Sequence, residues 1–203
     1  MINFDMTNEK YHAHKDVLSA SGTKTIAYDD LATFKYAERK ESAAFDVGTA
    51  THTFVFQPEN ADDVWMGAAD RRGLAWKKTK LEAEEAGALL LTEGDYLLAH
   101  DMAEAVRANK EAAMLLSGDL VCEASVFAKH ERTGIEIRCR PDGWRRDIGA
   151  LIDLKTTITS DPSGFGKQCA NFGYHVQDQH YRMCMEAAGF EIDRFVFIAV
   201  QKS

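Results

Sequence analysis

The chain has 203 residues, of which 45% are hydrophobic and 28% are charged, a balance that is ordinary for a soluble globular protein. Its 24 basic and 32 acidic residues give a formal net charge of −8, which argues against tight DNA binding by an overall basic surface. The first residues contain no apolar run, and no stretch of about 18 apolar residues occurs anywhere. We therefore expect a cytoplasmic protein without a membrane span, folded as a single domain over 1–203.

The first 90 residues are predicted to be mainly helical. Helical patterns cover 29–39 and 43–56, and 70–80 is expected to be a basic loop leading into a helix near 80–85. Thr92 is the predicted N-cap of a long helix over 92–116, whose apolar residues recur at helical spacing.

After Gly118 the pattern changes to that of strands. Apolar and β-branched runs predict strands over 120–129, 135–146 and 150–157, then a helix over 167–188 that ends at Gly189, and a last buried strand over 195–200. Residues 91–203 thus predict an αβββαβ core, in an α/β (α+β) protein whose residues 1–90 form a helical N-terminal region.

Two acids and a lysine interrupt these strand patterns. Asp153 and Lys155 are two residues apart, so on a strand both side chains leave the same face, and Asp142 precedes them across a turn. Charges in such apolar surroundings carry a desolvation cost, so they need partners or a metal ion. Two carboxylates converging with one lysine suit a Mg²⁺ or Mn²⁺ site for phosphodiester hydrolysis. The alternative is a buried Asp–Lys ion pair at a strand end.

Three short motifs together resemble a known superfamily. Pro141-Asp142, a spacer and Asp153-Leu154-Lys155 resemble the PD-(D/E)XK nuclease signature. Gly48-Thr49-Ala50-Thr51-His52 is similar to the Gly-x-x-x-His motif of its exonuclease branch, and Gln177-Asp178-Gln179-His180-Tyr181 to its Gln-x-x-x-Tyr motif. The likeness runs from about Tyr11 to the C-terminus and is closest to the nuclease domain of exonuclease VIII (RecE) and related phage recombination exonucleases. The αβββαβ order is that of the restriction-endonuclease-like core of this superfamily.

The resemblance implies a role for each matched residue. Asp142, Asp153, His52 and Glu123 are the implied metal ligands, with Mg²⁺ as cofactor and Mn²⁺ as its substitute. Glu136 competes with Glu123 for the place of the additional acid, and His52 is otherwise a satisfied core histidine. Lys155 is the implied catalytic lysine, placed beside the attacking water or the phosphate.

Gln177 and Tyr181 are four residues apart and share one helical face. In the family this pair supports the DNA backbone or the catalytic lysine. Some relatives hold an iron–sulfur cluster on four cysteines, but the cysteines here lack C-x-x-C spacing, and buried thiols are expected instead.

Basic and hydroxyl residues are the candidate DNA contacts. Arg71, Arg72 and Lys77 form one basic cluster, and Arg140 belongs to another beside the Pro-Asp motif; either cluster is otherwise a solvated face. Ser19 and Ser21 lie where a helix begins, so they cap that helix or hold a terminal phosphate.

The resemblance implies a metal-dependent DNA exonuclease that digests linear duplex DNA from its ends, 5′ to 3′, in phage-type recombination. A single-strand annealing protein is the implied partner, and the oligomeric state stays open. The alternatives are a single-strand or structure-specific nuclease on the same fold, a restriction endonuclease, and a catalytically silent DNA-binding module. The silent module is disfavoured because a protein without catalysis would have no physical reason to keep costly buried charges, and the chain has the full set of Asp142, Asp153, Lys155 and His52.

Overall fold

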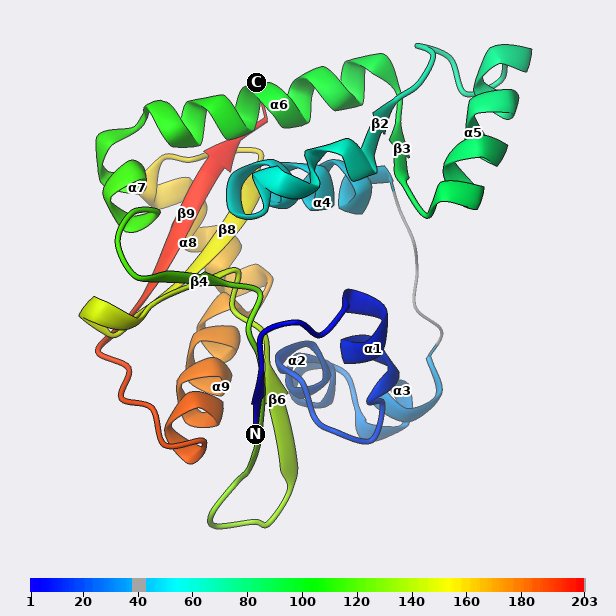
Figure 1. Ribbon diagram of the computed structural model, residues 1–203. Coiled ribbons are helices and arrows are strands. Elements are labelled where there is room, and N and C mark those ends of the chain that lie inside the picture. The colour runs from blue at the N-terminus through cyan, green and yellow to red at the C-terminus, as the bar shows by residue number, and fades with distance from the viewer. Residues whose placement is uncertain (38–42, 203) are drawn as a thin grey trace. The chain divides into compact units, whose positions relative to one another are not determined.

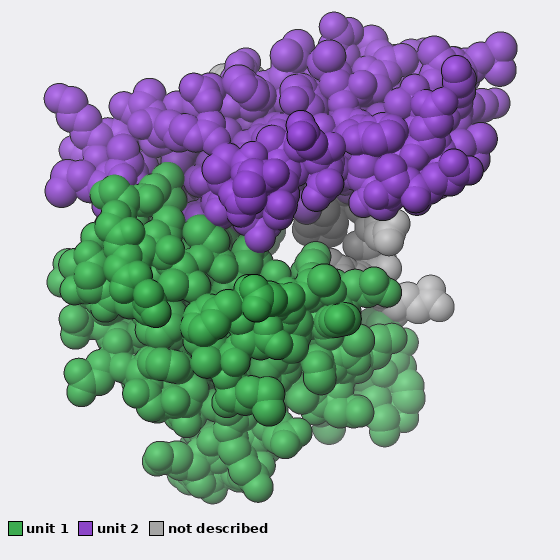
Figure 2. All heavy atoms as spheres, in the orientation of Figure 1, with its two compact units in different colours: residues 1–39, 115–153, 161–197 green, residues 40–114, 154–160, 198–203 purple. Residues whose placement is uncertain are grey.

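The structure is a computed structural model that describes residues 1–37 and 43–202. The chain forms both helices and mainly antiparallel strands (Figure 1), and the predicted mixed α/β class is confirmed. The chain divides into two compact units, each discontinuous in sequence (Figure 2). Unit 1 comprises 1–39, 115–153 and 161–197, and unit 2 comprises 40–114, 154–160 and 198–203. Both units therefore take residues from before and after position 90, and the single domain over 1–203 stays a prediction.

Unit 1 is built around two sheets. In the first, β5 (Ser125–Lys129) pairs antiparallel with both β1 (Ile2–Asn3) and β6 (Glu136–Cys139). The second has the order β4-β7-β8-β9, and in it β7 (Gly143–Arg145) pairs antiparallel with β4 (Leu120–Cys122) and β8 (Ala150–Thr157). Along the chain β8 and the last strand, β9 (Arg194–Gln201), continue from unit 1 into unit 2. The short η2 (Arg146–Ile148) joins β7 to β8.

Two of the predicted strands were wrong, since each is broken and changes sheet. The run 120–129 divides into β4 and β5 at Glu123, whose left-handed backbone, with φ at 54°, cannot continue a strand. The run 135–146 divides into β6 and β7 at 140–142, where Pro141 has no backbone N–H to donate to a ladder. The predicted strand over 150–157 is β8 with the same bounds.

Helices pack against the first sheet. Helix α9 (Tyr174–Ala187) contacts β5, β6 and α2 (Ala20–Tyr28), and a core cluster forms around Val126, Ile137 and Met185. The predicted helix over 167–188 was wrong in being continuous: α8 (Pro162–Asn171) precedes α9, and Gly173 between them has φ at 62°. The remaining helices of unit 1 are α1 (Asn8–Ala13) and α3 (Leu31–Tyr36); α3 lies within the predicted 29–39, whose last two residues are outside the described ones.

Unit 2 is centred on a helix pair. Helix α4 (Ala43–Phe56), predicted with these bounds, packs along α6 (Glu93–Ala108) (Figure 1). Phe54 of α4 and Met102 of α6 are buried. The predicted cap is confirmed, because the Thr92 hydroxyl accepts from the Asp95 N–H. The helix is shorter than predicted, since Asn109 caps a separate α7 (Lys110–Leu115). The remaining elements are η1 (Pro58–Asp63), β2 (Val64–Met66), α5 (Leu74–Ala86) and β3 (Leu89–Leu91), and β2 and β3 pair in parallel.

Helix α5 starts earlier than predicted, at Leu74 instead of near residue 80, because Trp76 and Ala83 give it a buried stripe. Within 1–37 and 43–202, none of the helices combines the length and the hydropathy that a bilayer crossing needs.

Candidate active site

The two strand breaks of unit 1 bring two acids together. Cys122, the last residue of β4, pairs with Gly143, the first residue of β7. Just beyond this pair the Glu123 N–H donates to the Asp142 carbonyl over 3.2 Å. As a result, Glu123 and Asp142 offer carboxylate oxygens within 4.8 Å of each other. At Glu123 and at Asp142 the chain passes from one sheet to the other, so both acids lie between strands and not within a hydrogen-bonded strand pair.

Asp153 lies on the neighbouring strand. Gly143 pairs with Ile152 of β8, so the antiparallel register sets Asp153 opposite Asp142 one residue further on. The Asp153 side chain is 2% exposed, and its Oδ2 accepts a hydrogen bond of 2.5 Å from the Gln177 amide of α9. A buried carboxylate needs such donors, because water no longer supplies them.

Tyr181 holds the turn that carries Asp142. Its hydroxyl, one helical turn after Gln177, donates to the Arg140 carbonyl over 3.1 Å. Burial raises the pKa of Tyr181 well above its usual value, and the nearby carboxylates of Asp153 and Asp142 raise it further. The phenol therefore stays protonated and remains a donor. Gln177 and Tyr181 share a helical face, as predicted, and that face supports two of the segments that bear the acids.

Glu123 is held in an unusual conformation. Among the described residues it is the one non-glycine with a positive φ, and such backbone strain persists only where the surroundings enforce it. Its Oε2 accepts a hydrogen bond of 2.7 Å from Nε of Arg140. This ion pair is shielded, since the two side chains are 10% and 23% exposed. The alternative acid, Glu136, is exposed on β6.

Lys155 follows Asp153 by two residues on β8 and is half-buried. His52 is on α4 in unit 2, also half-buried, with its ring 6.1 Å from that of Phe56. A Cβ added to Gly48, one turn before it, would lie 3.7 Å from Thr156 Oγ1, which is an ordinary contact. Packing therefore does not require glycine at position 48. The ligand role of His52 stays a prediction.

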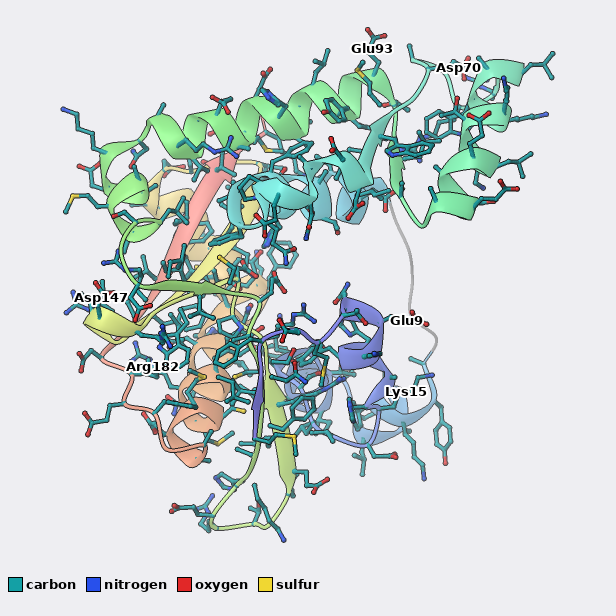
Figure 3. The ribbon with its side chains drawn as sticks, viewed as in Figure 1. Glu9, Lys15, Asp70, Glu93, Asp147 and Arg182 are labelled. Atoms are coloured by element: carbon teal, nitrogen blue, oxygen red, sulfur yellow. The ribbon has the colours of Figure 1, made fainter. Side chains whose placement is uncertain are left out.

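Two of the three residues of the predicted basic cluster in unit 2 have an acidic partner. Arg71 Nη2 lies 3.1 Å from the Asp95 carboxylate, and Arg72 Nε lies 3.5 Å from that of Asp70, which precedes α5 (Figure 3). Lys77 is exposed on α5 and the Arg72 side chain is 93% exposed, so both are accessible to DNA. Two further lysines are paired along the helix, Lys78 with Glu82 and Lys80 with Glu84.

The serine pair lies at the start of α2. The Ser19 hydroxyl accepts from the Gly22 N–H, so Ser19 caps this helix, which was one of its two predicted roles. The hydroxyl of Ser21 lies 3.0 Å from that of Ser19. Behind them His180 is buried, with Nε2 donating to the Arg138 carbonyl and Nδ1 lying 3.0 Å from the Thr23 hydroxyl.

Comparison with known protein families gives a match. The model of a family described as a "PDDEXK-like domain of unknown function (DUF3799)" matches residues 21–203. The chain belongs to this family. The predicted PD-(D/E)XK resemblance is thereby confirmed for the superfamily, whose nuclease-type α+β fold agrees with the structure. The narrower likeness to exonuclease VIII stays a prediction. No curated protein matches the chain.

The donors present fit a divalent metal ion. Mg²⁺ and Mn²⁺ prefer hard oxygen ligands, and Glu123 and Asp142 offer two such oxygens close together, beside Asp153. A PDDEXK-like fold with a potential acidic site therefore supports a divalent metal as cofactor, whichever ion it is.

Tyr11 and Arg138 are two further residues beside the site that the sequence motifs do not single out. Tyr11 is buried on α1 beneath the guanidiniums of Arg138 and Arg140. The one local signal is the spacing of the two arginines, which places both side chains on one face of an extended segment.

Proposed function

We propose that the protein is a metal-dependent DNA exonuclease that hydrolyses linear duplex DNA from its ends. The observation that carries this proposal is the convergence of Glu123, Asp142 and Asp153 in a chain of the PDDEXK-like family. The preference for ends, the 5′ to 3′ direction and the setting of phage-type recombination, with a single-strand annealing protein as partner, rest on the sequence resemblance.

In this proposal the acids bind the metal, and a bound divalent ion would polarise the scissile phosphate and lower the pKa of an attacking water. Gln177 keeps the Asp153 carboxylate oriented, and Tyr181 fixes the backbone immediately before Asp142. Such supporting contacts matter because small displacements of catalytic groups are costly.

Lys155 would supply a positive charge two residues beyond Asp153 on the same strand. Hydrolysis concentrates negative charge on the phosphate oxygens in the transition state, where a preorganised cation stabilises it most.

The experiment compares four substrates with and without Mg²⁺: end-labelled linear duplex, nicked circle, closed circle and single strand. We expect Mg²⁺-dependent loss of the linear duplex and survival of closed circles. The variant Asp153→Asn should abolish hydrolysis while keeping an oxygen that accepts from the Gln177 amide. The matched control is Asp16→Asn, because Asp16 is an exposed acid in the turn that follows α1.

Each other outcome points to a different function. Linearisation of closed circles would replace the exonuclease by an endonuclease, and digestion restricted to single strands would replace duplex as the substrate. Binding of DNA without hydrolysis in Mg²⁺ or Mn²⁺ would favour the catalytically silent module.

A further inference from the structure

Two arginines of unit 1 are buried beside the candidate site. Arg138 is 6% exposed, and the side chain of Arg140 is 10% exposed. They are two residues apart at the end of β6, and both guanidiniums lie over one aromatic ring. The Cζ atoms of Arg138 and Arg140 are 4.5 and 5.5 Å from the centroid of the Tyr11 ring.

The positive charge of this pair exceeds the negative charge that directly contacts it. Arg140 has an ion pair with Glu123, whereas Arg138 has no salt bridge to a described acid, and its Nη1 donates to the neutral Tyr11 carbonyl. Burial raises the pKa of the Tyr11 phenol, so the ring stays neutral and adds no anion. Burial also lowers the pKa of Arg138, although a guanidinium remains charged in proteins.

Two donors of the pair also lack an acceptor. Nη1 of Arg140 and Nε of Arg138 are buried, and neither makes a hydrogen bond to a described residue. A buried charge with an unused donor is costly unless a partner arrives. The pair is therefore one anion and at least two acceptors short of compensation.

We infer that Arg138 and Arg140 form a phosphate-binding subsite of the active site, in which Arg140 Nη1 donates to a non-bridging oxygen of a DNA phosphate. The guanidinium fork matches the spacing of phosphate oxygens, which explains arginine here better than lysine. Because the subsite lies beside Glu123 and Asp142, its ligand is the DNA phosphate that faces these two carboxylates. The inference rests on the proposed function and names the group that binds its substrate.

The local contacts of Arg140 leave one of its nitrogens for the substrate while another keeps its partner Glu123. The backbone of Arg140 is fixed, because the Tyr181 hydroxyl donates to its carbonyl. Its Nε meanwhile neutralises Glu123, so one carboxylate beside the incoming phosphate is already compensated. Arg140 thus positions Glu123 with one nitrogen and offers another to the substrate.

The test measures binding and not turnover. Short fluorescent duplexes with a 5′-phosphate or a 5′-hydroxyl are titrated with the full chain in EDTA and in Ca²⁺. Arg140→Lys keeps a charge for Glu123 but removes the second nitrogen of the fork, and Arg146→Lys, an exposed arginine paired with Asp119, is the matched control. Melting curves verify that each variant is folded.

We expect Arg140→Lys to weaken binding about tenfold or more, as loss of a hydrogen bond to a charged group does, and the control to stay within about twofold. If Arg140→Lys is unfolded, the double variant Arg140→Gln and Glu123→Gln replaces it, since it removes both charges of the pair and should bind as weakly. A larger loss for the 5′-phosphate duplex identifies the terminal phosphate as ligand, and equal losses identify an internal phosphodiester.

The inference is overturned if a folded Arg140 variant binds like the wild-type protein, or if the wild-type protein binds neither duplex in either buffer. The proposed function fails separately. If the protein never hydrolyses DNA but the Arg140 variants lose binding, the subsite stands and the nuclease does not. If hydrolysis is present and Arg140→Lys binds normally, the reverse holds.

Discussion

The hydrogen bond between Gln177 and Asp153 allows a quantitative test of how the site is supported. We predict that Gln177→Met, which keeps the volume of the side chain but removes the donor, destabilises the fold by about 2 kcal/mol. Both side chains are buried, at 7% and 2% exposure, and the amide donates to a carboxylate over 2.5 Å. Hydrogen bonds to charged groups contribute about 1.5–3 kcal/mol, and a protein of this size loses roughly 2–4 °C in Tm per kcal/mol.

The assay is a double-mutant cycle measured by urea unfolding in EDTA, so that a bound metal ion adds no stability of its own. The variants are Gln177→Met, Asp153→Ala and the double variant, with the exposed Gln179→Met as the control on the same helix. In the Asp153→Ala background the Gln177 amide has no carboxylate acceptor at position 153. Adding Gln177→Met should then lower the free energy of unfolding only slightly. The coupling energy should be about 1.5–3 kcal/mol.

A cost below about 0.5 kcal/mol for Gln177→Met, which is the range of ordinary surface changes, would refute this reasoning. An equal cost with and without Asp153 would also refute it, because the loss would then come from packing.

Three further outcomes are expected. Burial lowers the pKa of His180 below its usual 6.5, so folding favours the neutral ring. The free energy of unfolding should therefore be highest above about pH 6.5 and decrease as the pH falls below it. In urea unfolding between about pH 7 and 5, a His180→Gln variant should lose this pH dependence. Gly173→Ala should lower Tm by the equivalent of about 1–3 kcal/mol, since φ is 62° and the new Cβ would lie 2.6 Å from the Tyr28 ring; an unchanged Tm would contradict this. Arg72→Glu should weaken DNA binding more at low salt than at high salt, and a loss that is independent of salt would argue against a phosphate contact.

The sequence was sufficient for features that depend on neighbouring residues alone. The bounds of α4 and β8 and the cap at Thr92 follow from apolar periodicity and capping chemistry within one element. The shared face of Gln177 and Tyr181 is a property of any helix, and the structure bears it out because both donate to segments next to the acids. The PD-(D/E)XK signature likewise lies in short motifs and identified the superfamily.

Tertiary structure decided where the strands break. Apolar runs over 120–129 and 135–146 look continuous in sequence, yet each changes from one sheet to another, at Glu123 and at 140–142. A strand ends where its partner ends, and the partners of these strands are distant in the chain. The same crossing decided that Arg140 contacts Glu123, 17 residues away, instead of facing solvent as a basic patch would. Apolar periodicity shows which face of a helix or strand is buried. It does not show that the strand breaks at Glu123 and 140–142 lie together, because that depends on pairing between strands that are distant in the chain.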